Sequence, residues 1–178
     1  LLMDGKVKIT SVAHVSNVLG VVNPVDTLIA ICHKAGVPVL LDGAQGIIHL
    51  NVDVQKLDCD FYVFSGHKLF GPTGIGILYG KKDFLNAMPP WMGGGDMVGR
   101  VSFEKTTYAE LPLKFEAGTP NFIGAAGLGE AIKFIESIDS QFVEKYEKML
   151  VERMMNGLSS VGSLIIYGLS DNKVPLFS

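Results

Sequence analysis

Apolar residues gather along this chain in short runs separated by polar, glycine-rich turns. Three of the runs, at residues 37–41, 61–65 and 75–79, contain no charged side chain. Continuous apolar runs are typical of strands in a sheet covered on both faces, whereas half-exposed strands alternate apolar and polar positions. Residues 6–15 form a further extended stretch. With the helices described next, these runs predict an α/β fold that has a mainly parallel sheet and flanking helices.

The spacing of apolar positions predicts three helices. The first begins at Asn23-Pro24, where a capping side chain precedes a proline at the first helical position, and it ends at Gly36. The second covers residues 121–137 and has small residues on its early turns, which allow tight packing or the close approach of a ligand. The third covers residues 141–158.

The helices and strands divide the chain into two predicted parts. Residues 1–138 are expected to form part of a large α/β domain. Residues 139–178, a helix followed by a strand at 163–167, are expected to begin a smaller second domain. Glu144 and Lys148 stand four residues apart on that helix, a spacing that predicts an exposed ion pair.

The segment before the second helix is rich in residues that interrupt regular structure. Residues 89–95 combine proline and glycine and predict a loop whose backbone can approach a ligand closely. This segment lacks the G-x-x-x-x-G-K-[ST] pattern, so we reject a P-loop. Two interpretations of residues 89–95 remain, a structural turn and a mobile loop on the substrate side. Residues 98–115 are loosely patterned and predicted to be strand-like.

Composition argues against several classes of function. The 178 residues are 48% hydrophobic and 19% charged, and a net charge of −3 without clustered Lys or Arg makes nucleic acid an unexpected partner. No apolar run reaches the roughly eighteen residues of a membrane helix, and the first residues lack the features of a secretory leader.

The cysteines and histidines add no further chemistry. Cys32 and Cys59 are expected to be small buried residues, because two cysteines cannot form the disulfide framework of a secreted protein. A reducing cytoplasm is the expected location. The four histidines show no metal-ligand spacing, so no metal site is expected.

The strongest chemical signal is Ser65-Gly66-His67-Lys68, at the end of a predicted buried strand. An amine held at a strand end can be partly desolvated, which makes it nucleophilic enough to form an imine. A second apolar run ends at Asp42, and Gln45 follows three residues later. Alone, Lys68 would be a solvated charge and Asp42 a helix cap. Together at the ends of two strands, they indicate pyridoxal phosphate, which needs an amine for its aldehyde and an anion beside its ring nitrogen.

This hypothesis gives the two residues distinct roles. Asp42 would keep the pyridine nitrogen protonated, because an adjacent anion favours the cationic ring. The protonated ring would then withdraw electrons from the substrate's α-carbon. Lys68 would anchor the cofactor and later move the proton of that carbon.

The motifs along the chain resemble group II cysteine desulfurases and selenocysteine lyases, a branch of the class V aminotransferase superfamily. They follow the family's order and are His14–Gly20, Leu41–Gln45, Asp58–Tyr62, Ser65–Lys68, Gly71–Gly76 with Leu78-Tyr79, Pro89-Pro90 with Gly93–Gly95, and Phe115–Pro120. The resemblance implies the aspartate aminotransferase-like fold type I of pyridoxal-phosphate enzymes. Residues 1–138 would be the C-terminal half of the large domain, and residues 139–178 the start of the small C-terminal domain.

The resemblance also implies roles for five residues at the strand ends. Lys68 resembles the Schiff-base lysine and Asp42 the partner of the pyridine nitrogen. Gln45 resembles the donor to the ring hydroxyl. Ser65 and His67 resemble phosphate ligands, although a histidine in this position could instead be a core residue bonded to the backbone.

Two further residues complete the implied site. Asn17 resembles a residue that contacts substrate or cofactor. Thr119 resembles the phosphate contact that the family supplies across a homodimer interface. A threonine there could instead be a turn or cap residue, but the motif context favours the phosphate contact. Each site of the expected homodimer would therefore be built from two chains.

The implied reaction removes sulfur or selenium from L-cysteine or L-selenocysteine and leaves L-alanine and an enzyme persulfide. A sulfur-acceptor protein would serve iron–sulfur cluster assembly or another sulfur-transfer pathway. Neither Cys32 nor Cys59 lies in the family's catalytic cysteine motif. We therefore expect this chain to be an internal fragment that does not turn over cysteine by itself.

Two alternatives stay open at this point. Another class V pyridoxal enzyme, such as a kynureninase-like or serine-aminotransferase-like protein, would share an aspartate and a lysine on the same sheet. The combination of Ser65–Lys68 with Gly71–Gly76 favours the desulfurase branch. A non-catalytic scaffold would be expected to lose Lys68 or Asp42, and both are present in intact motifs.

Overall fold

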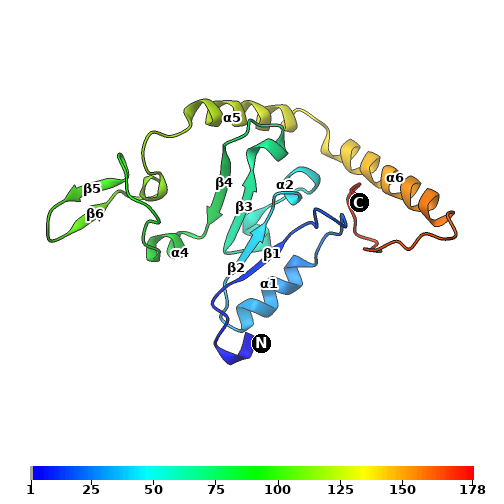
Figure 1. Cartoon of the computed structure of the whole chain (residues 1–178), viewed down its shortest axis with the longest axis horizontal. Coiled ribbons are helices and arrows are strands. Elements are labelled where there is room, and N and C mark those ends of the chain that lie inside the picture. Colours follow the sequence, from blue (N-terminus) through cyan, green and yellow to red (C-terminus); the bar gives the residue numbers. More distant parts are fainter. Residues whose placement is uncertain (1) are drawn as a thin grey trace.

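The computed structural model describes residues 2–178 and has a four-stranded sheet at its centre (Figure 1). The strands β1 (Thr10–Ala13), β2 (Val39–Asp42) and β3 (Phe61–Ser65) are parallel neighbours. β4 (Gly76–Gly80) pairs with β3 in the antiparallel direction. The predicted α/β fold with a mainly parallel sheet and flanking helices is confirmed. The extended stretch predicted for residues 6–15 is shorter, because only Thr10–Ala13 pair with a neighbouring strand.

The main core lies between α1 (Val25–Lys34) and the sheet. α1 presents one apolar stripe, and its buried residues pack with buried side chains of β2, β3 and their flanks. The cluster consists of Val25, Ile29, Cys32, Val37, Val39, Leu41, Cys59 and Tyr62. Burying each large aliphatic side chain contributes about 1.5–3 kcal/mol, so this face holds α1 on the sheet. Both cysteines are buried, as predicted.

The start of α1 differs from the prediction. The helix begins at Val25, and Asn23 does not cap it, because the side-chain amide of Asn23 donates to the carbonyl of Ala13 at 2.8 Å. That bond ties the helix start to the end of β1. Gly36 has φ of +68°, a left-handed conformation that suits glycine and ends the helix where predicted.

The sheet is not covered on both faces at β4. Ile77 and Leu78 follow one another in β4, so their side chains point to opposite faces, and they are 41% and 53% exposed. The prediction of two covered faces is therefore wrong for this strand within residues 2–178. A continuous apolar run indicates surfaces that gain from burial, but it does not show which segment buries them.

Several short elements were not predicted from the sequence. They are η1 (Leu2–Asp4), α2 (Gly46–His49), α3 (Val54–Leu57), η2 (Gly66–Leu69), α4 (Lys82–Ala87) and η3 (Leu113–Phe115). Helices of one or two turns show too little periodicity to be recognised. α3 had a local signal, since Asp53 caps it by accepting from the N–H groups of Gln55 and Lys56.

A hairpin forms one arm of the molecule (Figure 1). It consists of β5 (Val98–Val101) and β6 (Thr106–Tyr108), which pair antiparallel. Only these residues of the segment 98–115 are strands, so the strand-like prediction is confirmed in part. The loop predicted at residues 89–95 contains no helix or strand.

Two long helices lead away from the sheet towards the other arm (Figure 1). α5 (Phe122–Glu136) and α6 (Ser140–Ser159) confirm both predicted helices, and the predicted pair Lys148–Glu144 has a separation of 2.7 Å. The prediction of a strand at residues 163–167 is wrong. That segment is irregular, because its apolar residues find no strand to pair with in the described part of the chain.

The predicted boundary between residues 138 and 139 falls in the turn between α5 and α6. Two domains remain a prediction, and Leu1 lies outside the described residues. Among the helices of residues 2–178, none is long and apolar enough to cross a membrane.

Candidate active site

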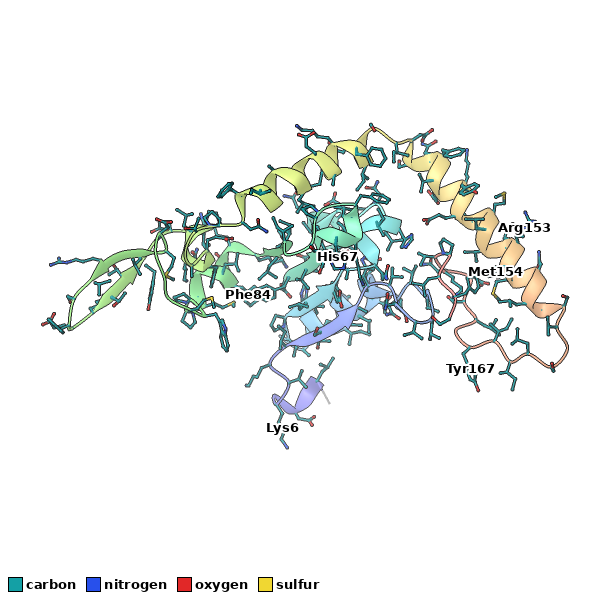
Figure 2. The ribbon with its side chains drawn as sticks, turned by 45° about the horizontal axis from the view of Figure 1, so that its top comes forward. Lys6, His67, Phe84, Arg153, Met154 and Tyr167 are labelled. Carbon is teal, nitrogen blue, oxygen red and sulfur yellow. The ribbon has the colours of Figure 1, made fainter. Side chains whose placement is uncertain are left out.

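Most of the residues predicted to form the site lie at one edge of the sheet. β2 and β3 are parallel, so their carboxyl ends meet at the same edge, and Asp42 pairs in register with Val63, two residues before Ser65. η2 follows directly and carries His67 and Lys68. We call residues 42–46 and 65–69 the carboxyl edge. Figure 2 shows His67 there, far from Lys6 near the start of the chain.

Asp42 lies in a tight turn after β2. Its Oδ1 accepts from the N–H of Ala44 at 2.9 Å, and the N–H of Gly43 donates to the carbonyl of Val63 at 2.8 Å. These bonds fix the backbone of the turn to β3. The Asp42 side chain nevertheless stays exposed, so the carboxylate is accessible to a ligand.

The ring of Tyr62 supports this turn from inside the protein. A Cβ atom on Gly43 would lie 1.9 Å from the Tyr62 ring, and one on Gly46 would lie 2.9 Å from the Tyr62 hydroxyl. Both positions therefore require glycine. Tyr62 is 1% exposed, and burial is the main cause that raises the pKa of its hydroxyl, with charge repulsion from Cys59 and Asp42 adding to it. The phenol thus remains neutral and acts as a packed support.

His14 forms a buried pair with Tyr62. Its Nδ1 lies 3.2 Å from the Tyr62 hydroxyl, and its backbone N–H donates to the carbonyl of Asp42 at 2.8 Å. Burial lowers the pKa of His14, and nearby Asp26 offsets only part of that effect. A neutral His14 therefore ties β1, β2 and β3 together beneath the carboxyl edge. This pair was not predicted from the sequence, where its signal is that the two residues lie in the motifs His14–Gly20 and Asp58–Tyr62.

Asn17 and Gln45 are brought together from segments far apart in sequence. The side-chain amide of Gln45 donates to the Oδ1 of Asn17. Ser16 shapes the turn that carries Asn17, since its Oγ accepts from the N–H groups of Val18 and Leu19 at 3.3 and 3.1 Å. Asn17 therefore lies beside the turn that carries Asp42.

The backbone of η2 is firmly held. Gly66 is buried, its N–H donates to the carbonyl of Ile75 at 2.8 Å, and its carbonyl accepts from Gly71 at 2.9 Å. α2 and α5 both contact η2. The side chains of His67 and Lys68 have no hydrogen-bond or ion-pair partner among residues 2–178. A rigid backbone thus presents an unpaired imidazole and an unpaired amine.

Thr119 lies farther along the chain than the other predicted site residues. It lies exposed in the loop that leads to α5, whose first turn is capped by Asn121. Asn121 also donates to the carbonyl of Gly74 at 3.2 Å, which holds this loop near the turn after η2. No side-chain hydrogen bond joins Thr119 to the other site residues in the described part of the chain. Its role across a homodimer stays a prediction.

The carboxyl edge offers the donor set that pyridoxal phosphate requires. An amine can bond to its aldehyde, a carboxylate can face its ring nitrogen, and a hydroxyl and an imidazole can bind its phosphate. The strand register brings these groups to one edge, and the residues present therefore fit the cofactor. Within residues 2–178, no group of three or more His, Cys, Asp or Glu side chains is arranged so that it could hold a metal ion.

A second polar cluster lies at the opposite end of β3. Asp60 is 3% exposed and accepts from the N–H of Val39 at 2.7 Å, from His33 at 2.8 Å and from Lys81 at 3.0 Å. Lys81 also pairs with Asp58 at 2.6 Å. Burial by itself would raise the pKa of Asp60, but these donors outweigh it and lower the pKa. We call these four side chains the Asp60 cluster.

Comparison with known proteins identifies related sequences and structures. The model of the family described as Aminotransferase class-V matches residues 2–176. A protein named cysteine desulfurase from Cronobacter sakazakii (strain ATCC BAA-894) is 54% identical over 168 residues, which are 94% of this chain and 41% of that protein. The chain thus spans about two fifths of the length of this curated relative.

Solved structures agree with the sequence matches. The cysteine desulfurase CsdA from Escherichia coli, in an S-sulfonic acid form, aligns with a TM-score of 0.81 and 46% identity over 85% of this chain and 38% of that chain. A mutant of C-DES with glycine covalently linked to its PLP cofactor aligns with a TM-score of 0.75 and 27% identity over 87% of this chain and 42% of that chain.

Proposed function

Because this chain belongs to the class-V aminotransferase family, we propose that it supplies the cofactor-binding edge of a pyridoxal-phosphate-dependent cysteine desulfurase. One observation carries the proposal. The end of β2 brings a carboxylate, and the segment after β3 an unpaired amine, to the same edge of the sheet. The similarity of most of this chain to a protein named cysteine desulfurase supports the choice of reaction.

The bound cofactor would supply an electron-withdrawing ring. Three residues of the carboxyl edge would bind or orient this ring and move the proton of the substrate. Lys68 would bond to the cofactor's aldehyde carbon through Nζ and, once the substrate has taken its place, would remove the proton from the substrate's α-carbon. Asp42 would keep a proton on the ring nitrogen. Gln45, held by Asn17, would donate to the ring hydroxyl.

The phosphate would be bound by the side chains at the end of β3. Ser65 would donate a hydroxyl, and His67 an N–H, to the phosphate oxygens. Thr119 would add a contact from the second chain of a homodimer. A dimer would therefore be needed for full affinity, and a dilution series that separates the protomers should release cofactor.

The proposed substrate is L-cysteine, which is converted to L-alanine while its sulfur passes to an enzyme cysteine. L-Selenocysteine is the alternative substrate. A sulfur-acceptor protein, as in iron–sulfur cluster assembly in the cytoplasm, is the proposed partner. Neither Cys32 nor Cys59 suits the role of sulfur carrier, because both are buried and burial is the main cause that raises the pKa of the Cys59 thiol.

The test measures both cofactor and product. The full-length protein to which this chain belongs should develop a visible absorption band with added pyridoxal phosphate. It should also release alanine and sulfide from L-cysteine in the presence of a thiol reductant. L-Selenocysteine, L-kynurenine and L-serine with a keto acid serve as comparison substrates. Turnover of kynurenine or transamination of serine, without release of sulfide from cysteine, would replace this proposal with the corresponding class V reaction.

A further inference from the structure

The last residues of the chain pack against the loop that carries Asn17. Residues 172–178, here called the C-terminal segment, return from α6 towards the sheet (Figure 1). Two backbone hydrogen bonds join them to residues 16–22, the Asn17 loop. Val22 N–H donates to the carbonyl of Asn172 at 3.0 Å, and Val174 N–H donates to the carbonyl of Gly20 at 2.8 Å.

Lys173 is at the centre of this contact. Its ammonium donates to the carbonyl of Leu19 and, at 2.9 Å, to the carbonyl of Leu176. It also lies 4.5 Å from the centroid of the Phe177 ring. Loss of water around the ammonium lowers the pKa of Lys173, and charge-assisted bonds to two carbonyls compensate for that loss. One cation thus joins two segments that are 154 residues apart.

The contact leaves little freedom in the Asn17 loop. Gly20 has φ of +67°, and a Cβ atom there would lie 2.6 Å from the carbonyl oxygen of Leu176. The hydroxyl of Ser178 donates to the carbonyl of Val18 at 2.8 Å. The carbonyls of residues 18, 19 and 20 therefore all bind the C-terminal segment, which fixes this part of the Asn17 loop.

We propose that Lys173 is a positioning residue that holds Asn17 against Gln45 and thereby sets the affinity of the site for the cofactor ring. The observation behind this is the sequence of contacts from Lys173 to Leu19, along the turn to Asn17, and from Asn17 to Gln45. The inference rests on the proposed function, because Gln45 has a ligand only if pyridoxal phosphate binds.

Equilibrium dialysis of pyridoxal phosphate against the intact apoprotein tests this without measuring turnover. Lys173→Met keeps the length of the side chain but removes the ammonium. It should weaken cofactor binding about tenfold, the typical effect of losing a hydrogen bond to a charged group. Lys173→Arg, which retains a donor and a charge, should restore most of the affinity. Lys148→Met, which removes an exposed lysine of α6, is the matched control and should bind as the unaltered protein does.

A double-mutant cycle separates positioning from a general loss of stability. Asn17→Ala should also weaken cofactor binding, and adding Lys173→Met to it should cost less than about twofold more, because the two residues act through the same contact. Ser178→Ala, a milder change, should weaken cofactor binding less than Lys173→Met does. Its effect should likewise not add to that of Asn17→Ala. It keeps the test decisive if Lys173→Met does not fold.

Three outcomes would overturn the inference. They are unchanged affinity in Lys173→Met, full additivity with Asn17→Ala, and no effect of Asn17→Ala itself. None of these touches the proposed function, which instead depends on Lys68. If Lys68→Ala bound the cofactor with the same absorption band as the unaltered protein, the proposed function would fail and this inference with it.

Discussion

The two ends of β3 carry similar polar residue types, which differ in burial and in pairing. At one end, the Asp60 cluster is closed, because Asp60 is buried and its carboxylate binds Val39, His33 and Lys81. At the carboxyl edge, Asp42 is exposed, and His67 and Lys68 have no partner among residues 2–178. A charge satisfied within the protein contributes to stability, whereas a charge left unpaired on a rigid backbone is available to a ligand. The comparison predicts that changes at the two ends affect different measurements.

The largest effect is expected from Lys68→Ala. It should abolish the visible absorption band with pyridoxal phosphate and lower the rate of sulfide release roughly 10²–10⁴-fold, the usual contribution of a positioned acid–base group. Because Lys68 makes no ion pair within residues 2–178, the free energy of unfolding should change by less than about 0.5 kcal/mol. Spectroscopy, a sulfide assay and urea denaturation measure the three quantities. A large loss of stability with the band intact would mean that Lys68 is structural.

Asp60→Ala should have the opposite profile. Removing one member of a buried ionic cluster destabilises a protein by about 3–5 kcal/mol, and urea denaturation should detect that loss. Asp58→Asn is the matched control, since Asp58 pairs with the same Lys81 but is 65% exposed at its side chain. The control should cost less than about 1 kcal/mol. Equal losses in both variants would contradict the distinction between closed and open ends.

The pH dependence of stability should reveal the same cluster. The donors around Asp60 lower its pKa in the folded protein, so its contribution is fully present above the unfolded value of about 4 and is lost as the pH falls through the folded value. The difference in unfolding free energy between the unaltered protein and Asp60→Ala should therefore be constant near neutrality and shrink below about pH 4. A difference that grew with acidity would have the wrong sign for this account.

Tyr62→Phe is expected to give a smaller effect. It keeps the ring on which Gly43 and Gly46 pack but leaves the Nδ1 of buried His14 without its partner. The expected loss of stability is about 1–2 kcal/mol, with cofactor binding little changed. Tyr79→Phe is the control on the adjacent strand, because the Tyr79 hydroxyl makes no hydrogen bond within residues 2–178. Loss of cofactor in Tyr62→Phe would show that the hydroxyl, and not the ring alone, shapes the site.

The smallest effect is expected from Lys148→Ala. Lys148 and Glu144 form a solvent-exposed ion pair on α6, and such pairs contribute little because water and salt screen them. The thermal midpoint should not change measurably. A clear drop would show that α6 depends on this pair in a way that its exposure does not indicate.

The comparison also shows which features of the fold could be predicted. The apolar runs at 37–41, 61–65 and 75–79 identified β2, β3 and β4, because continuous apolar runs of this length are typical of strands. The run at 163–167 is similarly apolar but is irregular. A strand needs a neighbour for its backbone bonds, and the presence of a neighbour is not a local property.

The sequence by itself determined which residue types stand at the carboxyl edge. Asp42 directly follows an apolar run and Lys68 lies three residues after the end of another, which made both recognisable, and the motifs around them resemble one family. Only the tertiary structure decided which polar groups are supports. His14 with Tyr62, Asp60 with Lys81 and Lys173 with Leu19 are pairs from distant segments. Their partners are set by the register of the strands and by the packing of the C-terminal segment against the Asn17 loop. Both depend on the whole fold rather than on neighbouring residues.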